Sequence, residues 1–148
     1  MYNTTTTSDV NSTPKPKLAN RGPTAIESNR LGDLAEMWVG FLATWKGAEV
    51  FPNLNSTGPA DLVFKIDGKI YEIDVKCDTY RYSTGKYGAA HTNEVKDPVY
   101  PVAVTPEGDI CNWKVRWIRN RAPEGLENFW SKEHTLNTPN AQIHHTPD

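Results

Sequence analysis

The sequence predicts an α/β domain in which a mixed β-sheet core is flanked by helices. Three observations carry this prediction: a long amphipathic segment at 24–47, a strand-turn-strand pattern at 61–77, and two later strand patterns followed by a short helix pattern. This order of elements is typical of the α/β class. With 148 residues, of which 37% are hydrophobic and 23% charged, the chain is long enough to bury one core of ordinary size.

The ordered domain is expected to span residues 23–130. Residues 1–22 are rich in Thr, Ser, Asn and Pro, so they lack the apolar side chains whose burial would offset the entropy of ordering. We predict a flexible N-terminal arm there. Residues 131–148 have the same character and are predicted to form a flexible C-terminal tail, in which His144 and His145 are solvated.

The first helix is predicted from the segment "PTAIESNRLGDLAEMWVGFLATWKG". Thr24 and Glu27 have the spacing of a capping box, and Gly47 stands where a helix commonly ends. Glu36 lies at the edge of the apolar face of this helix. The face itself is formed by Leu31, Leu34, Ala35, Trp38, Leu42 and Trp45.

The segment "DLVFKIDGKIYEIDVK" predicts a β-hairpin. Asp67 and Gly68 suit a two-residue type I′ turn, because both central positions need positive φ. Counting outward from this turn, Asp61 faces Asp74, since paired residues of an antiparallel ladder have a constant index sum. Side chains alternate between faces, so one face of the hairpin carries Asp61, Glu72, Asp74 and Lys76.

The remaining elements follow from shorter patterns. They are a strand at 48–52 before the hairpin, a loop with room for a short helix at 77–98, a strand at 99–104, a strand at 110–118 and a short helix at 123–130 that begins at Pro123. In the strand at 110–118, Trp113, Val115 and Trp117 alternate with polar residues. We expect this face in the core, and stacking on nucleic-acid bases is the alternative.

The two facing carboxylates require a compensating charge, because like charges directly opposite each other weaken a strand pair. A divalent cation would supply it, and oxygen ligands suit Mg²⁺ or Mn²⁺. Lys76 lies on the same face, about 7 Å further along the strand. An ammonium there can orient an attacking water and stabilise charge on a phosphate, which is the chemistry of phosphodiester hydrolysis. The alternative is that these charges form only the solvated face of a hairpin.

Four segments in order, "GDLAE", "GAEVFP", "ADLVF" and "YEIDVK", resemble the core of the PD-(D/E)XK nuclease superfamily. The small phage, intron-encoded and Holliday-junction-resolvase-like members are the most similar. The resemblance covers residues 31–77, about a third of the chain. It implies a restriction-endonuclease-like fold and Mg²⁺-dependent cleavage of DNA at the carboxylate hairpin.

The resemblance also implies roles for individual residues. Glu36 matches the glutamate of the helix, Asp61 the invariant aspartate, Asp74 the variable acid and Lys76 the lysine, with the three acids as metal ligands. The sequence departs from the family pattern in two places. The family's Pro-Asp is spread over residues 59–61 as Pro-Ala-Asp, and Asp74 stands where Glu or Gln is commoner.

Four basic residues are candidates for contact with nucleic acid. Arg81 and Lys86 follow the catalytic strand in an aromatic, Gly-containing segment, and we expect them to contact phosphates. Lys114 and Arg116 form a second basic cluster. That cluster is equally consistent with a solvated strand face.

The residue patterns predict phosphodiester hydrolysis, and the resemblance implies a Mg²⁺-dependent DNA endonuclease of structure-selective, homing or nicking type, associated with a phage or mobile element. A non-catalytic nucleic-acid-binding module and an RNA-directed nuclease are the alternatives. A homodimer would double the DNA contact area of so small a domain. The sequence has no apolar run of the roughly 18 residues that a membrane span needs, and no secretory signal. We therefore expect a cytoplasmic protein, in the host cytoplasm if a phage encodes it, with Cys77 and Cys111 reduced.

Overall fold

The computed structural model describes residues 27–54, 60–89, 98–118 and 121–139. The predicted N-terminal arm, the cap at Thr24 and the pair His144 and His145 lie outside these residues. No helix in the described part of the chain is both long enough and apolar enough to cross a membrane.

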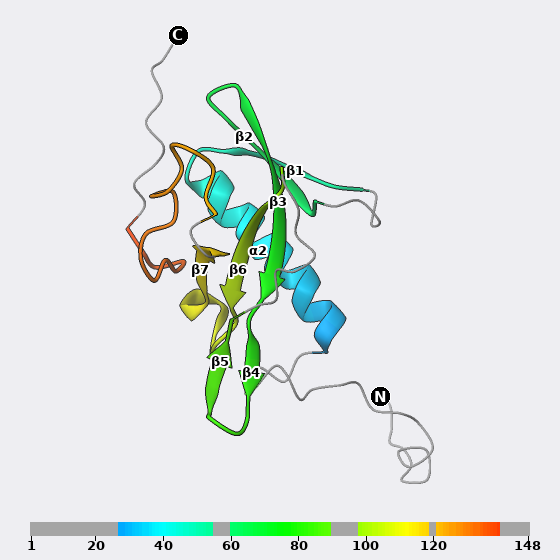
Figure 1. The fold of residues 1–148 in the computed structure, drawn as a ribbon, viewed down its shortest axis with the longest axis vertical. Coiled ribbons are helices and arrows are strands. Elements are labelled where there is room, and N and C mark those ends of the chain that lie inside the picture. Colours follow the sequence, from blue (N-terminus) through cyan, green and yellow to red (C-terminus); the bar gives the residue numbers. More distant parts are fainter. Residues whose placement is uncertain (1–26, 55–59, 90–97, 119–120, 140–148) are drawn as a thin grey trace, which may run out of the picture.

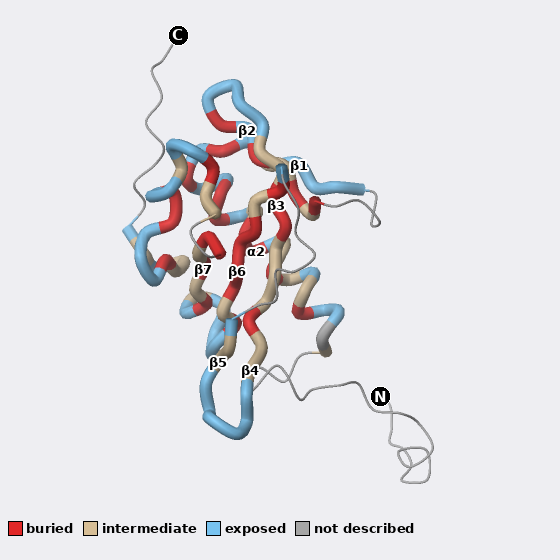
Figure 2. Tube along the Cα trace, viewed as in Figure 1, coloured by how far each residue is buried: buried red, intermediate tan, exposed pale blue. Residues whose placement is uncertain are grey.

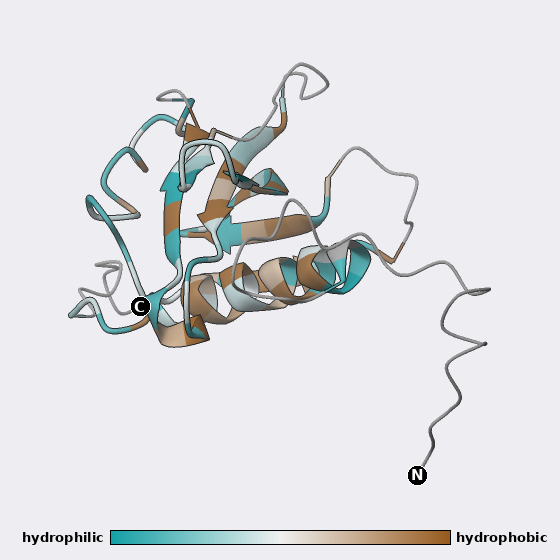
Figure 3. Cartoon of the chain, turned by 90° about the horizontal axis from the view of Figure 1, so that it is seen from below, coloured by the Kyte–Doolittle hydropathy of each residue, from teal (hydrophilic) through white to brown (hydrophobic). Residues whose placement is uncertain are grey.

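A five-stranded sheet with the strand order β1-β2-β3-β6-β7 forms the centre of the molecule, and helix α2 crosses it (Figures 1 and 3). Its strands are β1 (Glu49–Pro52), β2 (Leu62–Ile66), β3 (Lys69–Cys77), β6 (Tyr100–Thr105) and β7 (Lys114–Trp117). The β3–β6 pair is parallel, whereas the other three pairs are antiparallel. The sheet is therefore mixed, and the predicted α/β class is confirmed.

Helix α2 (Ser28–Trp45) begins one residue after its N-cap, Glu27. The Glu27 carboxylate accepts a hydrogen bond from the backbone N–H of Asn29 at 3.1 Å. The prediction that Thr24 is the N-cap and Glu27 the N3 residue of a capping box was therefore wrong, because Glu27 itself caps the helix. The predicted end is confirmed, since Gly47 has a φ of 108°, which suits glycine after a helix.

The buried face of α2 includes Val39 and Leu42, which are almost completely buried. Trp45 was expected on this face but is 57% exposed, because it lies at the border of the face in the last turn. Its ring stacks on Phe41 at a centroid distance of 6.5 Å. Together with Met37, these rings form an exposed apolar stripe at a spacing of four residues on the outer side of the helix.

The β2–β3 hairpin has the predicted turn and register. Asp67 and Gly68 have φ values of 50° and 78°, as a type I′ turn requires. The paired residues run from Ile66 opposite Lys69 to Leu62 opposite Ile73. Alternate side chains of β2 are buried in the main core cluster, as the period of two predicts.

The segment predicted as a loop contains a second, smaller hairpin. Strands β4 (Thr79–Arg81) and β5 (Lys86–Gly88) pair with each other and extend beyond the end of β3 (Figure 1). The connection between them is exposed along its length (Figure 2). We call residues 79–88 the ribbon.

Residues 121–139, which follow β7 in the described part of the chain, form turns and no helix. The short helix predicted at 123–130 is absent, because Gly125 adopts a φ of 86° and its N–H donates to the Glu127 carboxylate. Further on, His134 is buried and its carbonyl accepts the N–H of Val115 at 2.9 Å. Packed chain thus continues beyond residue 130. Trp113 and Trp117 are buried, as expected.

Candidate active site

The predicted acids lie where β2 begins and where β3 passes it. Ile73 is fully buried in the core, so alternation directs the next side chain, Asp74, to the other face of β3. Asp74 is paired with Pro101 and Lys76 with Ala103 of β6. Asp74 is thus flanked by the parallel strand β6 and is only 8% exposed.

Asp61 is held against β3 by two hydrogen bonds. The regular ladder ends at the pair Leu62 and Ile73, and the next backbone bond runs from the Asp61 N–H to the Ile73 carbonyl at 2.8 Å. The Asp61 Oδ2 atom accepts the backbone N–H of Val75 at 2.7 Å. The carboxylate of Asp61 is therefore fixed between the residues that flank Asp74.

The surroundings of Asp74 disfavour the ionised form of its carboxyl group. Burial, and after it the neighbouring Asp61 carboxylate, raise the pKa of its carboxyl group, and Lys76 partly offsets them, so that the pKa is about 6. The Lys76 Nζ atom lies 3.3 Å from Asp74 Oδ2. That oxygen is nevertheless buried without a partner in hydrogen-bonding geometry. A buried oxygen of this kind needs a further positive or donor group.

Glu36 of α2 stands near the pair without joining it. Burial raises the pKa of Glu36 to about 7, and the charges of Asp61, Asp33 and Asp74 contribute in that order. Across the described residues, however, no three acidic, His or Cys side chains approach closely enough to enclose a metal ion. The structure thus brings Asp61, Asp74 and Lys76 together and leaves Glu36 at their edge.

A hard divalent cation fits the residues that are present. The Asp61 and Asp74 carboxylates offer oxygen donors only, and Mg²⁺ is commonly held by one or two carboxylates with water completing its shell. Burial and the neighbouring negative charges raise the pKa values of Asp74 and Glu36, and a cation there would offset both causes. It would also give the buried Asp74 Oδ2 a partner.

Asn53, which the sequence analysis did not single out, supports Asp61. Its side-chain amide donates to the carbonyl of Ala60 at 2.7 Å, and its backbone N–H donates to the carbonyl of Asp61 at 3.0 Å. These bonds join the end of β1 to the start of β2. The one signal for this role in the sequence is that Asn53 directly follows the predicted strand at 48–52.

The fold has a counterpart among solved structures. No family model and no curated protein matches the sequence. The structure is similar to that of a bacterial homing endonuclease, I-Ssp6803I, with a TM-score of 0.50 and 23% sequence identity. The chain thus shares its α/β fold with that structure over the similar region. The similar region covers 62% of this chain and 66% of that one, just under two thirds of its length.

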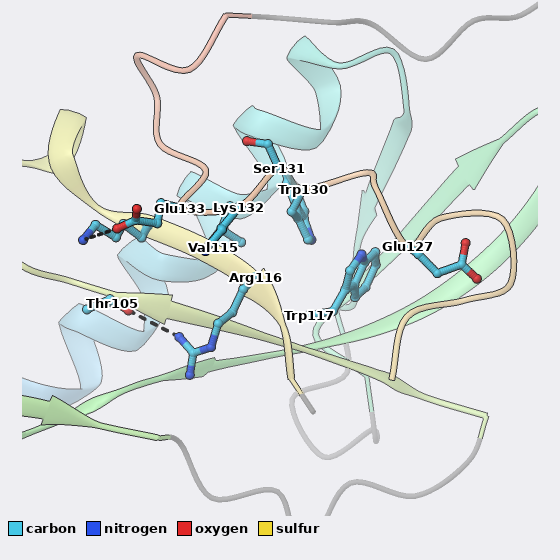
Figure 4. A pocket seen from close by; sticks show the side chains of 10 residues that line it. Thr105, Val115, Arg116, Trp117, Glu127, Trp130, Ser131, Lys132 and Glu133 are labelled. Atoms are coloured by element: carbon cyan, nitrogen blue, oxygen red, sulfur yellow. Dashed lines mark hydrogen bonds and ion pairs between the residues drawn. The ribbon is translucent and has the colours of Figure 1, made fainter. Parts of the chain in front are cut away.

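Arg116, one of the four basic residues proposed from the sequence, forms an ion pair inside the protein. Arg116 binds Asp78 through two nitrogens, at 2.7 and 2.9 Å, and Asp78 is 5% exposed. The Thr105 hydroxyl donates to the same carboxylate at 2.7 Å. Figure 4 shows the Arg116 guanidinium directed toward Thr105. Asp78, unnoticed in the sequence, therefore holds Arg116 in a structural ion pair.

The other three basic residues lie on the surface. Lys114 forms an ion pair with Glu133 at 3.4 Å in which both side chains are exposed. Arg81 and Lys86 are exposed and face each other across the ribbon. Among the described residues, no ion pair involves Arg81 or Lys86.

Proposed function

We propose that the chain is a divalent-metal-dependent endonuclease of the PD-(D/E)XK type that hydrolyses phosphodiester bonds in DNA. The observation that carries the proposal is the buried Asp74 carboxylate, which lies against the Asp61 carboxylate and 3.3 Å from the Lys76 ammonium. Such an arrangement destabilises the free protein but suits a cation and a phosphate. The fold likeness to a homing endonuclease supports the same class of reaction.

In this proposal Asp61 and Asp74 hold Mg²⁺ or Mn²⁺, which supplies Lewis-acid activation of a phosphate and of a water when bound. Lys76 donates hydrogen bonds to the attacking water or to a phosphate oxygen and stabilises the negative charge that develops. Glu36, whose pKa is raised to about 7, can take up a proton near neutral pH or add a third carboxylate to the metal site.

The proposed substrate is duplex DNA, cut at a target site as a homing or nicking enzyme does. The likeness to a homing endonuclease favours this choice over a junction resolvase and is consistent with a phage or mobile element as the source. Arg81 and Lys86 are proposed to contact phosphates, and Lys114 and Arg116 are proposed to do so with the exposed parts of their side chains. A homodimer is proposed as the cutting form, because one domain offers a small DNA contact area.

Cleavage of supercoiled plasmid tests the proposal. The wild-type protein should nick or cut in Mg²⁺ or Mn²⁺ and not in EDTA. Asp61→Asn, Asp74→Asn and Lys76→Ala should each lower the rate by about 10²-fold or more, since each removes a metal ligand or a charge-stabilising donor. Glu72→Gln is the matched control, because it removes a carboxylate from the same strand outside the carboxylate pair, and it should cut normally.

Equal rates for all these variants would refute the assignment. Calorimetric titration with Mn²⁺ gives an independent reading, in which Asp61→Asn and Asp74→Asn weaken binding and Glu72→Gln does not. Binding of DNA without cutting in either metal would instead support a non-catalytic module. Faster cutting of the matched RNA strand would support an RNA-directed nuclease.

A further inference from the structure

The ribbon pairs two basic residues with each other. Its register pairs Thr79 with Gly88, Tyr80 with Tyr87 and Arg81 with Lys86. Both cations are exposed, and no acidic residue occurs in the sequence from 79 to 89. Facing like charges destabilise a strand pair, so the ribbon has unbalanced positive charge that an anion would neutralise.

The opposite face of the ribbon holds it to the domain. Tyr80 and Tyr87 lie on that face with their ring centroids 5.1 Å apart, and Tyr82 packs edge-on against Tyr80. The Tyr87 hydroxyl donates to the carbonyl of Pro106, which follows β6, at 3.0 Å. Because the tyrosine face takes the attachment, the face with Arg81 is left toward solvent.

The base of the ribbon is joined rigidly to the sheet. The Asp78 N–H donates to the carbonyl of Val104 at 2.8 Å, and its carboxylate binds Arg116 of β7. Asp78 lies between β3, which carries Asp74 and Lys76, and β4. The position of the ribbon is therefore fixed relative to the candidate active site.

Gly88 leaves space for the side chain of Arg81. A Cβ atom at position 88 would lie 2.6 Å from Arg81 Nε and 3.2 Å from its Cζ. The guanidinium thus lies across the strand at the place where glycine stands. This packing holds the Arg81 guanidinium close to the ribbon on its exposed face.

We propose that the ribbon enters the major groove of the DNA and selects the target site. Arg81 and Lys86 contact phosphates of one strand, while the exposed connection at 82–85 meets base edges. A two-stranded ribbon fits the major groove, which is about 12 Å wide. From Lys76 to Ser83 the chain reaches up to about 23 Å at 3.3 Å per residue, so the contacted bases lie within about seven base pairs of the cut. The proposal rests on the proposed function for its choice of DNA as ligand.

A salt titration of binding tests the phosphate contacts. The full chain is mixed with a labelled 30-base-pair duplex in EDTA, and anisotropy gives the affinity between 50 and 200 mM NaCl. The double variant Arg81→Ala and Lys86→Ala should lower the slope of log affinity against log salt by about two. The control is Lys65→Ala with Lys69→Ala, which removes two exposed lysines from the β2–β3 hairpin at the other end of the sheet (Figure 1). Equal slopes for the two double variants would overturn the proposal.

Selection from a random-sequence duplex library tests the base contacts. Wild-type protein in EDTA should enrich a defined sequence, and Ser83→Ala with Thr84→Ala should change the enriched bases, because both hydroxyls are on the exposed connection. Unchanged enrichment, or none with the wild type, would overturn the reading role. Asp74→Asn should keep the wild-type enrichment. If Asp74→Asn also cuts normally, the proposed function fails while the ribbon result stands.

Discussion

At the scale of single residues, Asp74 shows how the site opposes stability. Its carboxylate is buried beside Asp61, and one oxygen has no hydrogen-bond partner. Ionisation of this group is therefore less favourable in the folded protein than in the unfolded chain, where water solvates the carboxylate. A group kept in such surroundings is expected to change the stability of the protein with pH.

The first prediction concerns that pH dependence. The pKa values of Asp74 and Glu36 are raised to about 6 and about 7, so the folded state binds more protons than the unfolded state between about pH 4 and pH 7. Stability should fall as pH rises through this range and level off above it. Asp74→Asn should stabilise the protein at pH 8 by up to about 3 kcal/mol, from two pKa units at 1.4 kcal/mol each.

Urea unfolding at pH 5 and pH 8 in EDTA measures this effect. Glu72→Gln serves as the control for loss of a carboxylate from the same strand. A variant Asp74→Asn that is less stable than wild type at pH 8 would contradict the prediction. Added Mn²⁺ should raise the wild-type unfolding midpoint at pH 8, because a ligand of the folded state stabilises it.

The second prediction concerns Asn53. Asn53→Ala removes the hydrogen bond to the Ala60 carbonyl, which should cost about 1 kcal/mol of stability. Because that bond positions the backbone next to Asp61, Mn²⁺ affinity measured by calorimetry should fall about 10-fold or more. Asn137→Ala is the control, since it also removes a bond from an amide to a carbonyl, that of Cys111, far along the chain. Equal Mn²⁺ affinities would refute the positioning role.

At the scale of elements, β7 carries two cations with different surroundings. Arg116 neutralises the buried Asp78, whereas Lys114 pairs with Glu133 on the surface. Breaking a buried pair leaves an uncompensated charge, while an exposed pair contributes little. The two residues stand two positions apart on one strand, so they can be compared directly.

The third prediction follows from this contrast. Arg116→Ala should destabilise the protein by about 2 kcal/mol or more, less than the 3–5 kcal/mol of a fully buried pair, because the Arg116 side chain is 43% exposed. Lys114→Ala should cost less than about 1 kcal/mol. Denaturant unfolding of both variants measures the difference. Equal losses would show that Asp78 does not depend on Arg116.

The elements that the sequence predicted correctly are those with local causes. The β2–β3 hairpin depends on the turn at Asp67 and Gly68, so its register and the closeness of Asp61 and Asp74 could be counted from the sequence. The buried core of α2 followed equally from its periodicity. Trp45 was predicted to be buried but is exposed. It stands at the border of the apolar face, where helical periodicity does not distinguish buried from exposed positions.

Non-local contacts explain the elements that were missed. The ribbon lacks an apolar alternation, and its attachment depends on Arg116, which lies 38 residues from Asp78 in the sequence. The helix pattern at 123–130 was overridden by the positive φ of Gly125. His134 is held in place by a bridge to Val115 of β7. The sequence around His134 does not indicate that β7 is its partner.

At the scale of the whole molecule, the fold includes chain beyond the expected domain end. Residues 131–139 pack on β7, and the His134 carbonyl satisfies the N–H of Val115. His134 itself is held by the Ser131 hydroxyl, 3.0 Å from its Nδ1 atom. This segment covers part of the sheet edge that β7 would otherwise leave open, through the bridge between His134 and Val115.

The fourth prediction tests this closure by truncation. A chain ending at residue 130 should unfold at lower denaturant than the full chain, because Val115 loses a backbone partner and buried surface is uncovered. A chain ending at residue 139 is the control and should match the full chain, since it keeps the contacts described above. Identical midpoints for the two truncated chains would show that residues 131–139 add nothing to stability.

The turn at Asp67 and Gly68 has a consequence for how this gene can change. Loss or gain of a single codon beside the turn would shift every opposing pair of β2 and β3 by one place. Such a mutation would expose the apolar face of one strand to water and separate Asp61 from Asp74. Descendants of this chain should therefore tolerate substitutions at the exposed positions of the hairpin far more often than a change in its length.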